Sequence, residues 1–212
     1  MPKRLTHNDM TNIGELRSDL LQLLTERSVC RGSFTLSSGA KSDLYIDAKL
    51  TTLDPRGALL VGRIGWHLIK EKAAARDLRV DSVGGLTMGA DSIALSIGIA
   101  ARMEDPTLAV QTFSVRKLPK IHGRHKLIEG NFSSGDFVVV VDDVITTGGS
   151  TLQAIDAIEA AGGKVAFVLV FVDREEGGRE RIEQRDVDVV PIFTRAEILS
   201  ADAHARSHPA LA

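Results

Sequence analysis

A pair of adjacent acids, Asp142 and Asp143, stands between an apolar run and a turn rich in hydroxyls and glycines. Residues 137–151 read FVVVVDDVITTGGST, and the turn contains Thr146, Thr147, Gly148, Gly149, Ser150 and Thr151. Hydroxyl donors, glycine backbone N–H groups and the N-terminus of a helix that starts near Gly149 all favour a bound anion. The segment therefore predicts a phosphate site at the carboxyl end of a buried strand.

The two carboxylates have a different task, because they would repel a phosphate. They suit hydrogen bonds from sugar hydroxyls, or a metal ion that is bound to the ligand. The combined pattern predicts a ligand with a phosphate at one end and a ribose beside it.

A basic segment precedes this strand. Residues 116–131 read RKLPKIHGRHKLIEGN, in which five cations and two histidines accompany a single acid, and the proline and glycines argue against regular structure. A solvated loop, a nucleic-acid patch and a mobile lid over a polyanion all fit this composition. The absence of an aromatic residue for stacking disfavours nucleic acid. The position next to the phosphate-site strand favours the lid.

Other strand ends carry weaker signals. Arg174 follows an apolar run at 164–172, where an arginine is either solvated, salt-bridged or a bidentate partner for a carboxylate. The sequence GGLTMGAD follows a short strand at 80–83 but lacks the GxGxxG spacing of a dinucleotide site. The histidines at 7, 67, 204 and 208 and the cysteine at 30 show no metal-ligand spacing.

The elements that must position these residues alternate between helix and strand. We expect helices at 13–29, 55–75, 93–101 and 152–161, a short helix at 179–185, a helical turn at 195–199, strands at 80–83, 108–115, 164–172 and 187–193, and a hairpin at 34–47. The helix at 55–75 is expected to bury Leu59, Leu60, Ile64, Trp66 and Leu68. This order is typical of an α/β fold with a mainly parallel sheet and helices on both faces.

The expected organisation is a single domain over 1–212. A small N-terminal hood at roughly 13–50 would cap a core at roughly 55–199, with residues 1–12 loosely held and a frayed tail at 200–212. The chain has 212 residues and a net charge of −2, which gives no bias toward nucleic acid or anionic membrane. One cysteine excludes an intramolecular disulfide, and no apolar run is long enough to span a bilayer. We therefore expect a cytoplasmic protein.

Four segments jointly resemble a known family. VVVVDDVITTGGST resembles the phosphoribosyl-pyrophosphate (PRPP) signature of type I phosphoribosyltransferases. FTLSSGAKSDLYID, RKLPKIHG and DREEGG resemble the hood motif, the catalytic loop and the orotate-side motif of the orotate phosphoribosyltransferases within that family. The resemblance spans about 13–199 and implies the type I fold and transfer of a phosphoribosyl group from PRPP to orotate, giving orotidine 5′-monophosphate in pyrimidine biosynthesis.

The resemblance also implies roles for individual residues. Asp142 and Asp143 would bind the ribose, residues 84–89 would form a pyrophosphate loop, and Thr146 and Arg174 would hold orotate with the backbone near Tyr45 and Ile46. The catalytic set would be Arg116, Lys120, His122 and Asp143. The PRPP set would be Arg116, Lys117, Lys120, His122, Asp142, Asp143, Val144, Ile145, Thr146, Thr147, Gly148, Gly149 and Ser150. Ser37 and Met88 stand where some relatives carry lysine.

The implied cofactor is Mg²⁺, held mainly by PRPP and water with no direct protein ligand. The implied partner is a second copy of the chain, with the loop at 116–126 acting on the neighbouring subunit's site. Alternative interpretations are a purine-type phosphoribosyltransferase and a PRPP-binding regulator on the same fold. A receiver domain fits poorly, because the acid pair lies two-thirds along the chain and precedes a phosphate turn.

Overall fold

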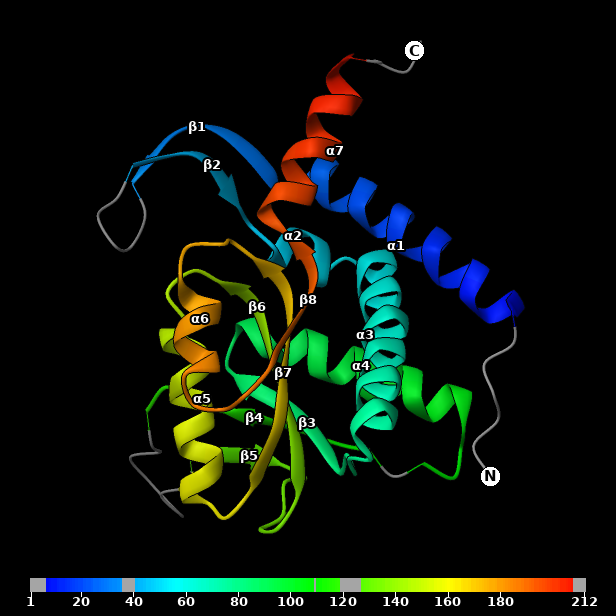
Figure 1. Ribbon diagram of the computed structural model, residues 1–212, viewed down its shortest axis with the longest axis vertical. Coiled ribbons are helices and arrows are strands. Elements are labelled where there is room, and N and C mark those ends of the chain that lie inside the picture. The colour runs from blue at the N-terminus through cyan, green and yellow to red at the C-terminus, as the bar shows by residue number, and fades with distance from the viewer. Residues whose placement is uncertain (1–6, 36–40, 109, 119–126, 208–212) are drawn as a thin grey trace.

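Helices and strands alternate along the chain in the computed structural model, which describes residues 7–35, 41–108, 110–118 and 127–207 (Figure 1). A six-stranded sheet forms the centre, in the order β5-β4-β3-β6-β7-β8. Its strands are β3 (Ser82–Leu86), β4 (Gln111–Val115), β5 (Ile128–Gly130), β6 (Phe137–Ile145), β7 (Lys164–Asp173) and β8 (Val189–Thr194). All neighbouring strands pair in parallel except β4 and β5. The predicted α/β fold with a mainly parallel sheet is confirmed.

Helices cover both faces of the sheet, because β6 is apolar on both. Val139 and Val141 belong to the cluster under α3 (Pro55–Arg76) and α4 (Gly89–Glu104). Val138 and Val140 belong to the cluster under α5 (Gly149–Ala160) and α6 (Gly178–Glu183). Successive side chains of a strand point to opposite faces, so one apolar run supplies two cores.

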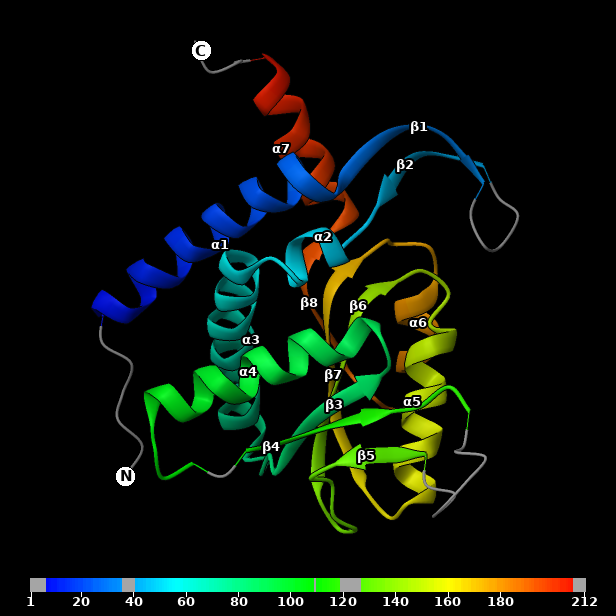
Figure 2. The same cartoon turned by 180° about the vertical axis from the view of Figure 1, so that it is seen from behind.

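The hood lies over the carboxyl ends of the parallel strands (Figures 1 and 2). It consists of α1 (His7–Ser28), the antiparallel hairpin of β1 (Val29–Thr35) and β2 (Lys41–Ile46), and the short α2 (Lys49–Thr52). The C-terminal α7 (Arg195–Ser207) packs beside α1. Arg17 of α1 binds Glu197 of α7 at 2.6 Å and lies over the Phe193 ring. These contacts hold the N-terminal helix α1 against the C-terminal helix α7.

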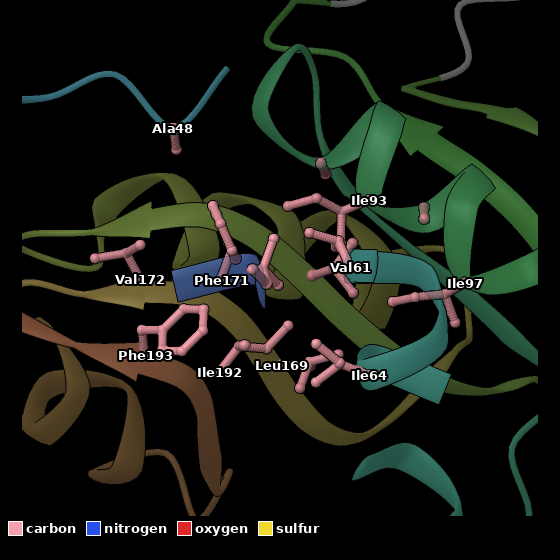
Figure 3. Close-up of a cluster of buried hydrophobic side chains, with 14 of the residues drawn as sticks. Ala48, Val61, Ile64, Ile93, Ile97, Leu169, Phe171, Val172, Ile192 and Phe193 are labelled. Carbon is pink, nitrogen blue, oxygen red and sulfur yellow. The ribbon is translucent and has the colours of Figure 1, made fainter. Parts of the chain in front are cut away.

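One apolar cluster joins the hood to the core. Figure 3 shows Ala48 of the hood above side chains from α3, α4, β7 and β8. Leu20, Leu24 and Ile46 belong to the same cluster and are almost fully buried. Burial of such side chains contributes roughly 1.5–3 kcal/mol each. The hood is therefore packed on the core rather than tethered to it.

Several boundaries differ from the sequence-based expectations. α1 begins at His7 within the stretch expected to be loose, and α7 continues to Ser207 through the expected frayed tail. Both extensions are polar or alanine-rich, so they lack the apolar period that signals a helix although alanine is the best helix former. Leu59 is exposed rather than buried. α4 begins at Gly89, before the expected 93, and β4 begins at Gln111 rather than 108.

Two further corrections concern pairing between strands. β5 occupies part of the segment expected to be irregular, because it pairs with β4 at the edge of the sheet. β3 extends to Leu86, so Gly84 and Gly85 belong to this strand and not to the expected loop. A Cβ at Gly85 would lie 2.0 Å from the Val141 carbonyl oxygen, so close strand packing requires glycine there.

Candidate active site

The carboxyl ends of β6 and β7 lie side by side, so the turns that follow them share one edge of the sheet (Figure 1). Ile145 at the end of β6 pairs with Asp173 at the end of β7. The backbone N–H of Arg174 donates to the Ile145 carbonyl oxygen at 3.0 Å. Ligands of open α/β sheets bind outside such strand ends. The segments predicted to bind phosphate and orotate therefore meet here.

Asp142 points toward α5 and is bonded within its own turn. Its Oδ2 accepts from Thr151 Oγ1 at 2.7 Å, and its Oδ1 accepts from the Asp143 N–H at 3.0 Å. The residue is 4% exposed. Burial raises the pKa of Asp142 to about 7, although the hydrogen bond from Thr151 acts in the opposite direction. The Thr151 hydroxyl, expected at the phosphate, is thus bonded to Asp142.

Asp143 points to the opposite face, between the hood and α4. Its Oδ1 accepts from the Val144 N–H at 2.9 Å, and its Oδ2 binds Lys49 Nζ at 2.8 Å. A Cβ at Gly89 would lie 2.4 Å from Oδ1, so the start of α4 approaches this carboxylate closely. The hydrogen bond with Asp143 raises the pKa of Lys49 against the effect of burial. Asp143 is therefore the acid that faces the hood.

The turn at 146–151, predicted to bind phosphate and called the phosphate turn below, leaves several of its hydrogen-bond donors accessible. Thr147, Gly149 and Ser150 are exposed, Val144 and Thr146 are half-buried, and Ile145 is buried. Gly148 has φ +75° and lies at the N-cap of α5, where it offers no side chain to cap the helix. A Cβ there would lie 2.8 Å from the Gly178 carbonyl oxygen. The N-terminal N–H groups of α5 are consequently available to an anion.

Arg174 is buried beside this turn. The residue is 3% exposed, and its Nη2 binds Glu176 Oε1 at 2.9 Å. Asp173, the preceding residue, accepts the Glu175 N–H at 2.8 Å, and burial raises the pKa of Asp173. A buried guanidinium at the end of a strand can bind a planar anion through two parallel N–H bonds.

The hairpin places its two predicted residues differently. Ile46 is buried in the apolar cluster that joins hood and core. Tyr45 is exposed, and its ring lies 5.5 Å from that of Phe34. Tyr45 is also close enough to Lys49 to help raise its pKa, after the larger effects of Asp143 and Asp47, whereas burial lowers that pKa.

A turn at Thr87 and Met88 connects β3 to α4, and the peptide bond between them is cis. Asp91 in the first turn of α4 accepts from Thr87 Oγ1 at 2.7 Å and from Ser114 Oγ at 2.5 Å. Ser114 lies near the end of β4, which leads into the basic segment. Asp91 thus links the predicted pyrophosphate turn to the root of the predicted lid.

The basic segment is described only at its two roots. The Arg116 N–H donates to the Leu127 carbonyl oxygen at 2.8 Å, which closes the loop at its base. Gln153 Nε2 of α5 donates to the Lys117 carbonyl oxygen at 3.0 Å. Lys120 and His122, like Ser37 of the hairpin turn, lie outside the described residues. Arg116 and Lys117 therefore start from the same edge as the phosphate turn.

Comparisons with known proteins agree with this geometry. Residues 102–197 match the model of the phosphoribosyl transferase domain. The orotate phosphoribosyltransferase of Rhodopirellula baltica is 39% identical over 175 residues, which cover 82% of this chain and 90% of that protein. The enzyme of the same name from Aquifex aeolicus is 40% identical over 186 residues, covering 86% and 97%.

The chain belongs to the orotate phosphoribosyltransferase family. It is accordingly an enzyme of the phosphoribosyltransferase class, as the motifs predicted. A crystal structure of Mycobacterium tuberculosis orotate phosphoribosyltransferase in complex with PRPP has a TM-score of 0.68 and 36% identity, and covers 86% of this chain and 98% of that chain. The adenine phosphoribosyltransferase of Trypanosoma brucei, 15% identical with a TM-score of 0.63, shares the fold alone.

Two residues at the site of this phosphoribosyltransferase were not found from the sequence. Lys49 follows the hairpin and belongs to no recognisable motif. The one available signal is its positive charge within the segment predicted to cap the site. Gln153 belongs to the exposed face of α5, and nothing in its spacing distinguishes it from other surface residues. Both depend on contacts between residues far apart in the chain.

Metal ligation has little protein support in the described ranges. Within them, no group of three or more His, Cys, Asp or Glu side chains is arranged to hold a metal ion. One carboxylate at the site belongs to Asp143, whose Oδ2 binds Lys49. Mg²⁺ in phosphate-transferring sites is held by one or two carboxylates together with substrate oxygens and water. This donor set fits an ion that arrives with its ligand.

No helix in the described residues is both long and apolar enough to cross a membrane.

Proposed function

We propose that this chain transfers the 5-phosphoribosyl group of PRPP to orotate, giving orotidine 5′-monophosphate and pyrophosphate in de novo pyrimidine biosynthesis. One observation carries the proposal: the phosphate turn, Asp143 and Arg174 meet at one edge of the sheet under the hood. A phosphorylated sugar and an anionic ring can therefore bind next to each other. Membership of the family supports the same reaction.

In this proposal the turn at 146–150 binds the 5-phosphate through hydroxyls and the N-terminal N–H groups of α5. Asp143 accepts hydrogen bonds from the ribose hydroxyls. Asp142 acts mainly by fixing the turn, because both its oxygens are bonded to Thr151 and to the backbone. Val144 and Ile145 contribute through their backbone, since Ile145 is buried.

Transfer breaks the bond between the ribose C1 and the pyrophosphate oxygen and forms a bond from C1 to the ring nitrogen of orotate, whose N–H proton is released to water or to the pyrophosphate. Positive charge develops on the ribose, and negative charge develops on the leaving group. Arg116, Lys117, Lys120 and His122 would stabilise the leaving pyrophosphate and exclude water. No covalent nucleophile is required. Mg²⁺, held mainly by PRPP and water, would supply further positive charge to the pyrophosphate.

Orotate would bind between Thr146, Arg174 and the backbone near Tyr45 and Ile46. The Arg174 guanidinium carries five N–H donors, so it can bind an anionic ring while it remains paired with Glu176. Uracil lacks the carboxylate that such a cation recognises. The arrangement thus favours an acidic pyrimidine over a neutral base.

A substrate panel tests the reaction. Orotate, uracil, hypoxanthine and guanine are each mixed with PRPP and Mg²⁺, and nucleotide formation is followed by absorbance and chromatography. Of the four bases, we expect only orotate to be converted to a nucleotide. This activity should be lost when a chelator removes Mg²⁺. Turnover with hypoxanthine or guanine but not orotate would contradict the proposal and indicate a purine-type enzyme.

We further propose a homodimer with shared sites. Leu95, Ile99 and Met103 form a stripe along α4, each more than half exposed, and Leu59 of α3 is exposed as well. In Figure 2 no other element lies in front of α4. Apolar surface of this kind is typical of an interface.

We also propose that the chain forms a single domain, because one apolar cluster joins the hood to the core. A cytoplasmic location is proposed because the chain contains a single cysteine.

Subunit mixing tests whether the loop at 116–126 acts on the neighbouring site. Lys120→Ala and Asp143→Asn proteins are each expected to keep less than about a tenth of wild-type activity as homodimers. After unfolding and refolding together, a loop that acts on the partner restores about a quarter of wild-type activity, because half the dimers then contain one intact site. A loop that acts within its own subunit restores none. A monomer by analytical ultracentrifugation would rule out the dimer.

A further inference from the structure

The ion pair between Lys49 and Asp143 joins the hood to the acid pair. Lys49 is the first residue of α2, and its Nζ lies 2.8 Å from Asp143 Oδ2. The Lys49 side chain is 42% exposed, whereas that of Asp143 is only 13% exposed. The lysine therefore reaches from the rim onto a carboxylate that is largely removed from solvent.

The backbone beneath Lys49 is firmly placed. Its N–H donates to Asp47 Oδ1 at 3.2 Å, and Ala48 is buried in the cluster that joins hood and core. Thr51 bonds Ser28 through their hydroxyls at 2.7 Å, and a Cβ at Gly57 would lie 2.0 Å from the Thr51 carbonyl oxygen. A short helix clamped on both sides holds the ammonium over Asp143 without support from a ligand.

Asp143 needs such a partner because of what surrounds it. The phosphate turn that follows it and the turn before Gly89 are both predicted to bind phosphate groups. An uncompensated carboxylate between two phosphate sites would repel the ligand. A carboxylate oxygen has two lone pairs, so Oδ2 can keep the lysine and still accept a ribose hydroxyl.

We propose that Lys49 is a positioning residue of the PRPP site, which acts through Asp143. Its ammonium orients the carboxylate toward the ribose and offsets the carboxylate's charge beside the phosphates. This inference rests on the proposed function only in taking PRPP as the ligand, and it does not depend on which base accepts the ribose.

Calorimetric titration of Mg²⁺ and PRPP, without any base, provides the first test. Lys49→Met keeps the apolar stem and removes the charge, so PRPP binding should weaken about tenfold, the size expected for a charge-assisted contact. Lys49→Arg should bind within about threefold of wild type, since it restores the charge. Lys72→Met is the matched control. It breaks an ion pair of similar length, between Lys72 and Asp188, and should leave PRPP binding unchanged.

A double-mutant cycle separates action through Asp143 from direct contact with the ligand. If Lys49 acts through Asp143, adding Lys49→Met to Asp143→Asn should weaken PRPP binding by less than about twofold. The KM for orotate should stay within about twofold in Lys49→Met while that for PRPP rises. Fully additive effects, unchanged or tighter PRPP binding in Lys49→Met, or equal losses for both substrates would each overturn the proposal.

The two proposals fail in different ways. A wild-type protein that binds PRPP but does not convert orotate refutes the proposed reaction and leaves the Lys49 test intact. A wild-type protein that does not bind PRPP with Mg²⁺ refutes both.

Discussion

Two adjacent aspartates of β6 lie on opposite faces of the sheet and have different surroundings. On the α5 face, Asp142 is buried and bonded to Thr151 and to its own backbone. On the α4 face, Asp143 contacts the hood through Lys49 and approaches Gly89. The residues are neighbours in sequence, but the alternation of a strand separates their surroundings.

This difference indicates a division of labour within the acid pair. Asp142 is buried, and each of its oxygens bonds a group that shapes the phosphate turn. Asp143 binds Lys49 and lies where the hood and the core meet. We therefore expect the α5 face to determine stability and the α4 face to determine activity.

The largest effect is expected from Gly89→Ala, on the α4 face. The new Cβ would lie 2.4 Å from Asp143 Oδ1, so the carboxylate must shift. Because a displacement of about 1 Å in a catalytic group lowers rates by roughly a hundredfold, turnover of orotate should fall by about that factor. Gly14→Ala is the control, since nothing lies within 4 Å of a Cβ at Gly14. Equal activity in the two variants would show that Asp143 is not under tight positional control.

The next effect separates the two acids directly. Asp143→Asn should lower kcat/KM for PRPP by more than about tenfold, because it removes a charged acceptor from the ribose side. Asp142→Asn keeps the shape of the turn and should cost less than Asp143→Asn. Steady-state kinetics with both variants checks this order, and the reverse order would assign the ribose contact to Asp142.

A pH effect should appear on the α5 face. The pKa of Asp142 is raised from 3.8 to about 7 in the folded protein, so the unfolded chain loses this proton first as pH rises. The stability associated with Asp142 is thus fully present below 3.8 and is lost as the pH rises through about 7. Asp142→Asn removes this titration, and its unfolding free energy relative to wild type should improve by about 1–3 kcal/mol between pH 5 and pH 8. Urea unfolding at both pH values measures it; a constant difference would place the titration elsewhere.

The smallest effect is expected from Thr151→Val. It removes the hydroxyl that donates to Asp142, and should lower the unfolding free energy by about 1–2 kcal/mol at pH 5. Thr151→Ser retains the donor and should be closer to wild type. Thermal unfolding of the two variants makes the comparison, and equal losses would show that the hydroxyl contributes no more than the methyl group that Thr151→Ser removes.

Much of the fold was predictable because it depends on local patterns. The apolar run of β6, the glycines after it and the helix that follows are contiguous, so period and composition reveal them. The ends of α1 and α7 were missed because their polar or alanine-rich turns carry no apolar period. β5 was missed because a strand of three residues exists only through its pairing with β4.

The sequence by itself determined the chemistry at this site: an acid pair, a phosphate turn, a basic segment and an arginine at a strand end. Each is a short contiguous motif whose residue types specify what it can bind. Only the tertiary structure decided which acid faces the hood and which cation accompanies it. Lys49 and Asp143 are 94 positions apart, and their contact arises from the packing of the hood on the core. Such pairings depend on the burial of apolar surface between distant segments, which no local pattern records.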